Sequence, residues 1–187
     1  MSEKVIVWGF GTEYDRFSKW LEPEVRKGNM EIEAILLNEE NLLRSLDGIE
    51  VIGVEELLVR EYDYLINMNQ TDPAMIANIL NMLKIPSWKV IPIKVFGLPC
   101  FDLKRWIKVK ESRISIISHN CWGGYTYNSL GMEFLSPFIN MFMEPKDYFR
   151  LLNHFDFYMK LPLHYIREGY EPVLKRNYPV AGLEDVT

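Results

Sequence analysis

The sequence lacks an apolar run of the length that a membrane-spanning helix needs. Such a helix takes about 18 or more consecutive apolar residues. The most apolar late segment, residues 134–143, is shorter than this and is interrupted by Ser136 and Pro137. The N-terminus has no signal-peptide core either, because Lys4 and Val5 lead directly into a strand pattern. We therefore expect no membrane span.

Cysteine and histidine are both scarce. The two cysteines, Cys100 and Cys121, make no disulfide framework, which favours a reducing compartment and predicts a cytoplasmic protein. The three histidines do not combine with these cysteines in a standard metal-ligand spacing, so we expect no metal site. They are His119, His154 and His164.

Basic residues do not predominate. The 21 lysines and arginines are outnumbered by 26 aspartates and glutamates, which gives a net charge of -5. A nucleic-acid-binding surface must be basic to attract phosphates, so nucleic acid is not the expected partner. The hydrophobic fraction of 48% and the charged fraction of 25% are ordinary for a folded globular chain and exclude general disorder.

Short apolar segments alternate with helical patterns through the first half. A strand at 4–8 ends at Gly9 and precedes a helix from Thr12 to Lys27, with Thr12 as its N-cap and Gly28-Asn29 as its stop. The apolar face of this helix is predicted to comprise Tyr14, Phe17, Leu21 and Val25. Further strands are expected at 32–37, 50–52, 64–68 and 89–93, with helices at 42–46, 54–60 and 73–84. This alternation predicts an α/β fold for residues 1–96, with a Rossmann-like, mostly parallel sheet.

A second, smaller α/β unit is expected at residues 105–187. The composition changes after Phe96, and a basic connector runs from Lys104 to Lys110. A strand is predicted at 113–118 and a helix at 145–155. Aromatic residues are frequent in this half and fill a core or stack on sugar rings, with the core the more frequent use.

The glycine turn after the first strand is a candidate nucleotide site. Gly9 and Gly11 precede a helix N-terminus, where phosphates bind to free N–H groups. Tyr14 replaces the third glycine of the dinucleotide fingerprint. The second strand ends in Asn38 in place of an acidic residue, and Asn38 is the candidate ligand contact there, beside Gly9 and Gly11. A nucleotide sugar therefore suits the turn better than NAD, no cofactor is firmly implied, and a purely structural turn stays open.

Amide side chains follow the fourth strand. Asn67 and Asn69 lie where ligands bind in open parallel sheets, at the carboxyl ends of the strands. The alternative interpretation is loop polarity together with capping of the helix that starts near Asp72.

The segment Ser118-His119-Asn120-Cys121-Trp122-Gly123-Gly124 contains the densest group of reactive side chains. On an extended chain His119 and Cys121 share a face, as a nucleophile and its base require. Alternatively, His119 deprotonates a sugar hydroxyl while Asn120 orients the substrate. The structural interpretation is a buried Cys121, a core tryptophan and a tight glycine turn.

Three stretches resemble a bacterial domain family without an assigned biochemical function that occurs among exopolysaccharide and capsule biosynthesis proteins. They are residues 114–124, Ser136-Pro137-Phe138-Ile139-Asn140 and Asp147-Tyr148, and the resemblance covers residues 105–187. In this family we expect a second polar residue such as Asn at the place of His119. Its members continue past Val186-Thr187 into a strand and a basic helix, so the resemblance implies that the C-terminal unit can be incomplete here.

The N-terminal half resembles Rossmann-like domains attached to sugar-modifying enzymes. Residues 50–57 and 61–66 carry this resemblance. In those relatives the domain binds a nucleotide sugar beside a transferase domain. The best hypothesis is therefore a transferase acting on a nucleotide sugar or polysaccharide precursor, with His119 as base and with Asn120 and Cys121 on the substrate. A non-catalytic binding or assembly subunit, and an acyltransferase or hydrolase that uses Cys121, are the alternatives. The oligomeric state stays open.

Overall fold

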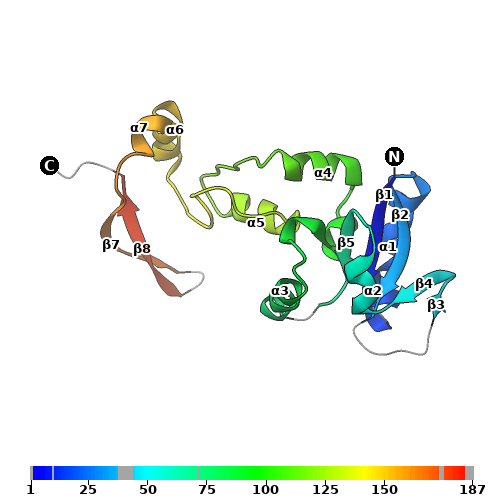
Figure 1. The fold of residues 1–187 in the computed structure, drawn as a ribbon. Helices are drawn as coiled ribbons and strands as arrows, with labels where there is room; N and C mark the ends of the chain where they lie inside the picture. Colours follow the sequence, from blue (N-terminus) through cyan, green and yellow to red (C-terminus); the bar gives the residue numbers. More distant parts are fainter. Residues whose placement is uncertain (1, 10, 38–43, 71, 173–174, 184–187) are drawn as a thin grey trace. The chain divides into compact units, whose positions relative to one another are not determined.

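The computed structural model describes residues 2–9, 11–37, 44–70, 72–172 and 175–183 (Figure 1). The chain forms two compact units. Unit 1 comprises Met1–Ile116 and Gly124–Pro137, and unit 2 comprises Ile117–Gly123 and Phe138–Thr187. The short segment 117–123 therefore belongs to unit 2 although unit 1 precedes and follows it, whereas the expected division at residues 96–105 followed the order of the sequence.

Unit 1 is built on one sheet. Its strands are β1 (Glu3–Trp8), β2 (Met30–Leu36), β3 (Ser45–Leu46), β4 (Ile49–Ile52), β5 (Tyr64–Asn67) and β6 (Val90–Pro92). The helices from the start of the chain to residue 129 are α1 (Thr12–Arg26), α2 (Val54–Val59), α3 (Pro73–Met82), η1 (Ser87–Lys89), η2 (Ile93–Gly97), α4 (Leu103–Glu111) and α5 (Trp122–Ser129), where η marks a 3-10 helix.

The strand order is β3-β4-β2-β1-β5-β6, and every neighbouring pair is parallel except β3 with β4. This arrangement confirms the expected α/β fold with a mostly parallel sheet. From the central β1 the chain proceeds to β2 and β4 on one side, and then to β5 and β6 on the other. The order therefore reverses between β1 and β5, and ligands of open α/β sheets bind at the carboxyl ends of the strands at such a switch point.

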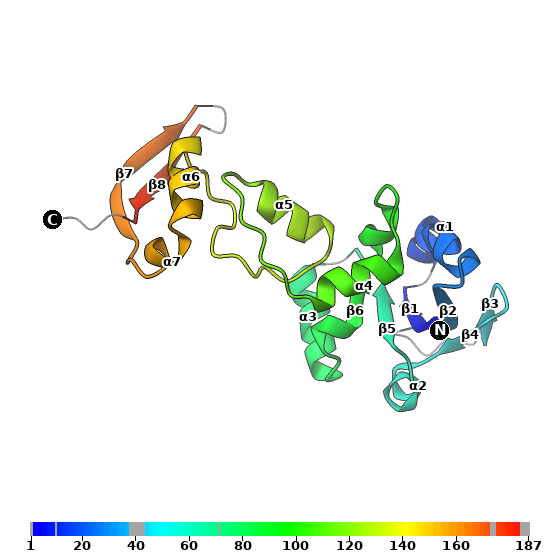
Figure 2. The same ribbon diagram turned by 90° about the horizontal axis from the view of Figure 1, so that it is seen from above.

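Helices cover both faces of this sheet, because the buried side chains of β1 alternate. Val5 and Val7 belong to a cluster that contains the apolar face of α1. Ile6 and Trp8 point into a second cluster with residues of α2 and α3. Figure 2 shows α1 and α2 on opposite sides of the sheet. Burying each such apolar side chain contributes about 1.5–3 kcal/mol, so the alternation fixes the register of β1.

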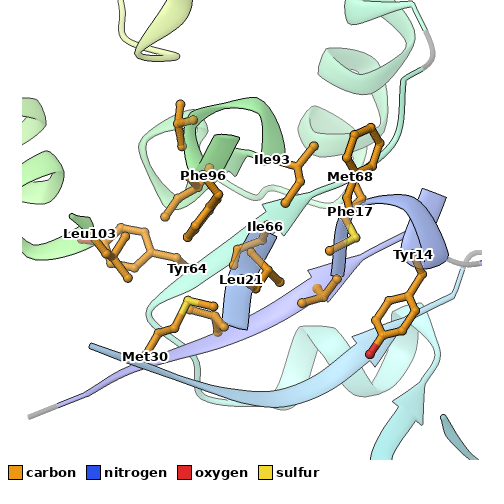
Figure 3. Close-up of a cluster of buried hydrophobic side chains, with 14 of the residues drawn as sticks. Tyr14, Phe17, Leu21, Met30, Tyr64, Ile66, Met68, Ile93, Phe96 and Leu103 are labelled. Carbon is orange, nitrogen blue, oxygen red and sulfur yellow. The ribbon is translucent and has the colours of Figure 1, made fainter. Parts of the chain in front are cut away.

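The buried face of α1, which packs in the first cluster, differs from the predicted one at one position (Figure 3). Tyr14, Phe17 and Leu21 are buried as expected. Val25 is 41% exposed, and Glu24 is buried in its place. Helical spacing permits either position as the next member of the buried face, so apolar character alone selected the wrong residue.

Two other local predictions for unit 1 are wrong. Ser45 and Leu46 form strand β3 in place of a helix, because they pair with Ile49 and Glu50 across a tight turn; residues 42–43 of that predicted helix lie outside the described residues. Thr12 is the first residue of α1 and not its cap. Gly11 occupies the cap position, with φ of 61° and no side chain that could accept a hydrogen bond from the helix.

The expected basic connector is the helix α4. Asp102 caps it by accepting a hydrogen bond from the Arg105 N–H at 2.9 Å. Leu103 and Trp106 are buried in the first cluster, whereas Lys104 and Arg105 face solvent. The segment is therefore an amphipathic helix with Lys104 and Arg105 on its exposed side.

Unit 2 contains α6 (Pro145–Asn153), α7 (Phe155–Tyr158), β7 (His164–Glu171) and β8 (Arg176–Gly182). The predicted helix at 145–155 is confirmed, with a break at His154 between α6 and α7. β7 and β8 pair in an antiparallel hairpin. Among the described residues, no helix combines the length and the apolar character that crossing a membrane requires.

Candidate functional site

Residues 114–118 do not form the predicted strand, and side chains satisfy their backbone groups. In unit 1 the Ile116 N–H donates to the Tyr127 hydroxyl at 2.7 Å, and this hydroxyl donates to the Ile114 carbonyl at 3.0 Å. In unit 2 the Tyr148 hydroxyl donates to the Ile117 carbonyl at 3.1 Å. Tyrosine hydroxyls thus form the hydrogen bonds that the backbone of a neighbouring strand would otherwise form with this segment.

The loop that follows is organised by Ser118. The Ser118 hydroxyl donates to the Asn120 carbonyl and accepts the Gly123 N–H at 3.1 Å. The side-chain oxygen of Asn120 accepts the Trp122 N–H at 2.9 Å. Two side chains therefore satisfy N–H groups in the first turn of α5. The side-chain oxygen of Asn120, a residue that we expected to contact substrate, is therefore engaged in capping α5.

The glycine pair lies inside the helix and not in a tight turn. Gly123 and Gly124 are both within α5, and both are buried. His119 and Asn120 form a bend and Cys121 a turn, so His119 and Cys121 do not lie on one face of an extended strand. Among the described residues, Cys121 forms no hydrogen bond with His119. Its thiol is free and exposed.

His119 is held at three points within unit 2. Its carbonyl accepts the Met143 N–H at 2.7 Å. Its ring lies 5.5 Å from the ring of Tyr148, centroid to centroid, at an angle of 49°. Its Nε2 lies 3.4 Å from the side-chain nitrogen of Asn120. The imidazole is half-buried, so it is oriented by its neighbours and still accessible.

These contacts select a tautomer for the neutral imidazole. The Asn120 oxygen is occupied by the Trp122 N–H, so the amide NH₂ is the group that faces His119. An NH₂ group can only donate, so this contact is a hydrogen bond only in the tautomer that has its ring proton on Nδ1. The unprotonated Nε2 is the atom that a general base needs.

The second candidate region lies at the switch point of unit 1. Trp8 pairs with Asn67 in the sheet, so the ends of β1 and β5 are adjacent. The Asn67 oxygen accepts both the backbone and the side-chain N–H of Asn69, each at 3.0 Å. The Asn69 amide also donates to the Trp8 carbonyl at 3.3 Å. Both amides thus stabilise the loop, which is the structural alternative that the sequence left open.

The two glycines of the turn are required for different reasons. Gly9 has φ of 152°, and a Cβ on it would lie 2.7 Å from the Cβ of Met68. Gly11 has φ of 61°, and a Cβ on it would meet nothing within 4 Å. Gly9 is therefore required because a side chain there would overlap Met68. Gly11 is required by its positive φ alone, since the space around it is open. Asn38, the remaining expected ligand, lies outside the described residues.

Sequence reasoning missed Glu24, the most completely buried charged side chain of those described. Its carboxylate contacts Lys27 Nζ at 2.6 Å, and accepts hydrogen bonds from the Asn29 amide at 2.8 Å and the Leu103 N–H at 2.9 Å. Burial raises the pKa of Glu24, but these partners outweigh burial and hold the pKa below its ordinary value. The carboxylate thus joins α1 to the start of α4, and its role is structural. No sequence signal identifies it.

Potential metal ligands do not converge in the described part of the chain. No group of three or more His, Cys, Asp or Glu side chains there could hold a metal ion.

Comparison with known proteins relates the two halves of the chain to different families. Residues 1–91 match the model described as C2185-like, N-terminal. An uncharacterized protein of Haemophilus influenzae is 33% identical over 79 residues, which is 42% of this chain and 35% of that protein, so the chain spans well under two thirds of this relative. Residues 93–187, half of the chain, match the model for a domain of unknown function, and the chain therefore belongs to the DUF1919 family.

Proposed function

We propose that the chain is a transferase that acts on a nucleotide sugar or a polysaccharide precursor, with His119 as its general base. The observation that carries the proposal is the fixed imidazole of His119, oriented by Met143, Tyr148 and Asn120. Histidine is the side chain best suited to accept a proton near neutral pH. The proposed setting is the cytoplasm, since both cysteines are free thiols.

In the proposed reaction, an acceptor hydroxyl oxygen attacks the anomeric carbon of the nucleotide sugar. The bond from that carbon to the diphosphate oxygen breaks, and the nucleoside diphosphate leaves with the electron pair. The hydroxyl proton passes to Nε2 of His119. The contact of Nε2 with Asn120, at 3.4 Å, is long for a hydrogen bond, so an approaching hydroxyl displaces a weak interaction.

Considered by itself, unit 1 contains a candidate nucleotide-binding region. The strand order reverses between β1 and β5, which is where ligands bind in open α/β sheets. The free space at Gly11, directly before the N-terminus of the 15-residue helix α1, suits a diphosphate. Glu13 and Asp15 lie in the first turn and oppose this role by charge repulsion.

A non-catalytic binding subunit is the second candidate. The observation that favours it is the use of Ser118 and Asn120 as caps of α5, which gives the loop a structural purpose. In that case unit 1 would bind the nucleotide sugar and His119 would not react. A Cys121-dependent acyltransferase or hydrolase has less support, because Cys121 has no hydrogen bond to His119 among the described residues.

Three variants separate these functions. UDP-glucose, UDP-galactose and GDP-mannose are tested for a rise in the melting temperature and for release of nucleoside diphosphate with the chain. His119→Ala should abolish release but keep the melting temperature and the ligand-induced shift. The matched control His154→Ala, at an exposed position in unit 2, should change neither the release of nucleoside diphosphate nor the melting temperature with or without ligand. Cys121→Ser should keep activity if the thiol is not the nucleophile.

The outcomes distinguish the candidates. Binding without release in the wild-type chain supports the binding subunit. Absence of both binding and release for all three donors would count against transferase and binding subunit alike. Loss of activity in Cys121→Ser, but not in His119→Ala, would favour covalent chemistry.

A further inference from the structure

The hairpin of unit 2 exposes most of its side chains. Among its described residues only Gly169 is buried, and Tyr165, Ile166 and Tyr170 are each at least 60% exposed. Among the described residues no third strand joins the two-stranded sheet of β7 and β8 (Figure 1). An isolated two-stranded hairpin is marginal in water, and three or more strands are needed for stability. The hairpin therefore has the properties of an incomplete sheet.

The two edges of this hairpin are not equivalent. β8 contains Pro179, which has no N–H to donate and is typical of an edge strand that faces solvent. Lys175 and Arg176 precede this proline, and positive charges also oppose edge pairing. β7 contains no proline, and the positive charge of its Arg167 is accompanied by the negative charges of Glu168 and Glu171. The free edge of β7 is therefore the one that can accept a further strand.

The regular part of β7 is complementary in charge to itself. The ladder is irregular between Tyr165 and Arg167, so the regular pairing runs from Arg167 to Glu171. An antiparallel copy of this segment, with Gly169 on the two-fold axis, places Arg167 directly opposite Glu171 of the partner subunit. Residues 167, 169 and 171 share one face of the strand, so both ion pairs form on the same side of the sheet.

The surrounding charges fit this arrangement. Arg167 is exposed and has no ion-pair partner among the described residues. Glu168 already bonds to the Asn177 amide at 3.1 Å, on the side of the hairpin away from the free edge. Glu171 lies opposite Arg176 in the hairpin, so a row across the extended sheet would read Arg176, Glu171 and then Arg167 of the partner subunit. Charges of opposite sign would alternate along that row.

We propose that two copies of this chain associate through the free edges of β7 and form a four-stranded antiparallel sheet. An isologous pairing needs one self-complementary segment, and residues 167–171 supply it. A strand from another source would have to bring matching charges to this edge, whereas a second copy of the chain carries them in the same segment. This inference is independent of the proposed transferase activity.

Charge reversal tests the pairing. Sedimentation of the 187-residue chain should give a dimer of the 22.1 kDa subunit. Arg167→Glu and Glu171→Arg should each weaken dimerisation about tenfold or more, since each places like charges opposite one another twice per dimer. The double variant should bind more tightly than either single variant, but below the wild-type affinity, because an arginine at position 171 also faces Arg176 in the hairpin. Lys160→Glu, a matched charge reversal at an exposed position outside the hairpin, should have no effect.

Hydrogen exchange provides a second measurement that does not depend on how the variants fold. Backbone amides of β7 should become protected as the protein concentration rises, whereas those of β8 should not. A chain that remains monomeric at about 1 mM would overturn the proposal. It would also be overturned by a double variant as weak as the single ones, or by concentration-dependent protection in β8 and not in β7.

Discussion

The hydroxyl of Tyr127 accepts the backbone N–H of Ile116 at 2.7 Å and donates to the carbonyl of Ile114 at 3.0 Å. One side chain of α5 thus satisfies two backbone groups of an extended segment that has no neighbouring strand. Tyr127 is fully buried, so water cannot replace these bonds. The relationship fixes the course of the chain three residues before His119.

Tyr127→Phe should therefore destabilise the protein by about 1–3 kcal/mol. The substitution keeps the ring but leaves the Ile116 N–H and the Ile114 carbonyl without their partner. Urea denaturation measures the effect. Tyr125→Phe, two residues away on the same helix and 70% exposed, is the control and should change the midpoint little. Equal effects of the two variants would contradict the role assigned to Tyr127.

Glu24→Gln should destabilise the fold by about 2 kcal/mol or more. The amide cannot accept from Asn29, Leu103 and Lys27 as the carboxylate does, and one of its own N–H groups would face a donor. Because the pKa of Glu24 is lowered in the fold, its stabilisation is present above the ordinary pKa near 4.5 and is lost as the pH falls through the lowered value. Thermal unfolding from pH 7 to pH 3 should show this loss in the wild type.

The control for this experiment is Glu22→Gln, two residues before Glu24 on α1 and half-exposed. Its ion pair with Arg26 is a surface contact, which contributes about 0–1 kcal/mol. A wild-type chain whose acid sensitivity matched that of Glu24→Gln would show that the buried carboxylate does not link stability to pH.

Local patterns sufficed to predict most of unit 1, and long-range contacts explain the failures. The apolar runs of β1, β2 and β5 form hydrogen bonds with one another, so their apolar composition is enough to predict that they are strands. The run from Ile114 to Ile117 is also rich in isoleucine, but its backbone groups bond to the hydroxyls of two distant tyrosines and not to a neighbouring strand. Glu24 is similar, since its burial depends on Leu103, which lies 79 positions away.

The candidate loop shows the same limit. The sequence shows a segment dense in reactive side chains, but no local pattern predicts that Ser118 caps a helix. Two adjacent glycines have low helix propensity and favour a turn in a local interpretation. In the structure, Ser118 and Asn120 satisfy the first N–H groups of α5, and the glycines are buried within the helix.

Gly9→Ala and Gly11→Ala should separate scaffolding from ligand binding. The Cβ at position 9 would overlap Met68 at 2.7 Å in addition to backbone strain, so this variant should lose about 3 kcal/mol or more of stability. At position 11 only the strain at φ of 61° applies, at about 1 kcal/mol. Denaturant unfolding gives both values, and a larger loss at position 11 would contradict the packing argument.

The same pair of variants bears on the nucleotide site. If Gly11 lines the phosphate side, a methyl group there should reduce the melting-temperature rise caused by UDP-glucose while the fold persists. The comparison is made at temperatures where Gly11→Ala is fully folded. An unchanged ligand response would remove Gly11 from the site without affecting the assignment of His119.

Lys110 should make the stability of the protein increase with pH between about pH 8 and pH 10. Its ammonium group donates to the carbonyls of Trp88, at 2.8 Å, and Val90, at 3.3 Å, and lies 4.7 Å from the centre of the Trp106 ring. Burial nevertheless lowers the pKa of Lys110 from 10.5 to about 8. Between these two values the folded chain holds a neutral amine and the unfolded chain a charged one. Unfolding then takes up a proton, so a higher pH favours the folded state.

Lys110→Met removes this titration and keeps most of the apolar contact of the side chain with Trp106. The free energy of unfolding of both proteins is measured by urea denaturation at several values from pH 7.5 to pH 10. The wild type should gain stability relative to the variant as the pH rises, because every other titrating group is common to both. The burial-raised pKa of Tyr64, about 12, lies above this window. A difference that is constant across the range would show that Lys110 keeps its charge in the fold, held by the two carbonyls and the ring.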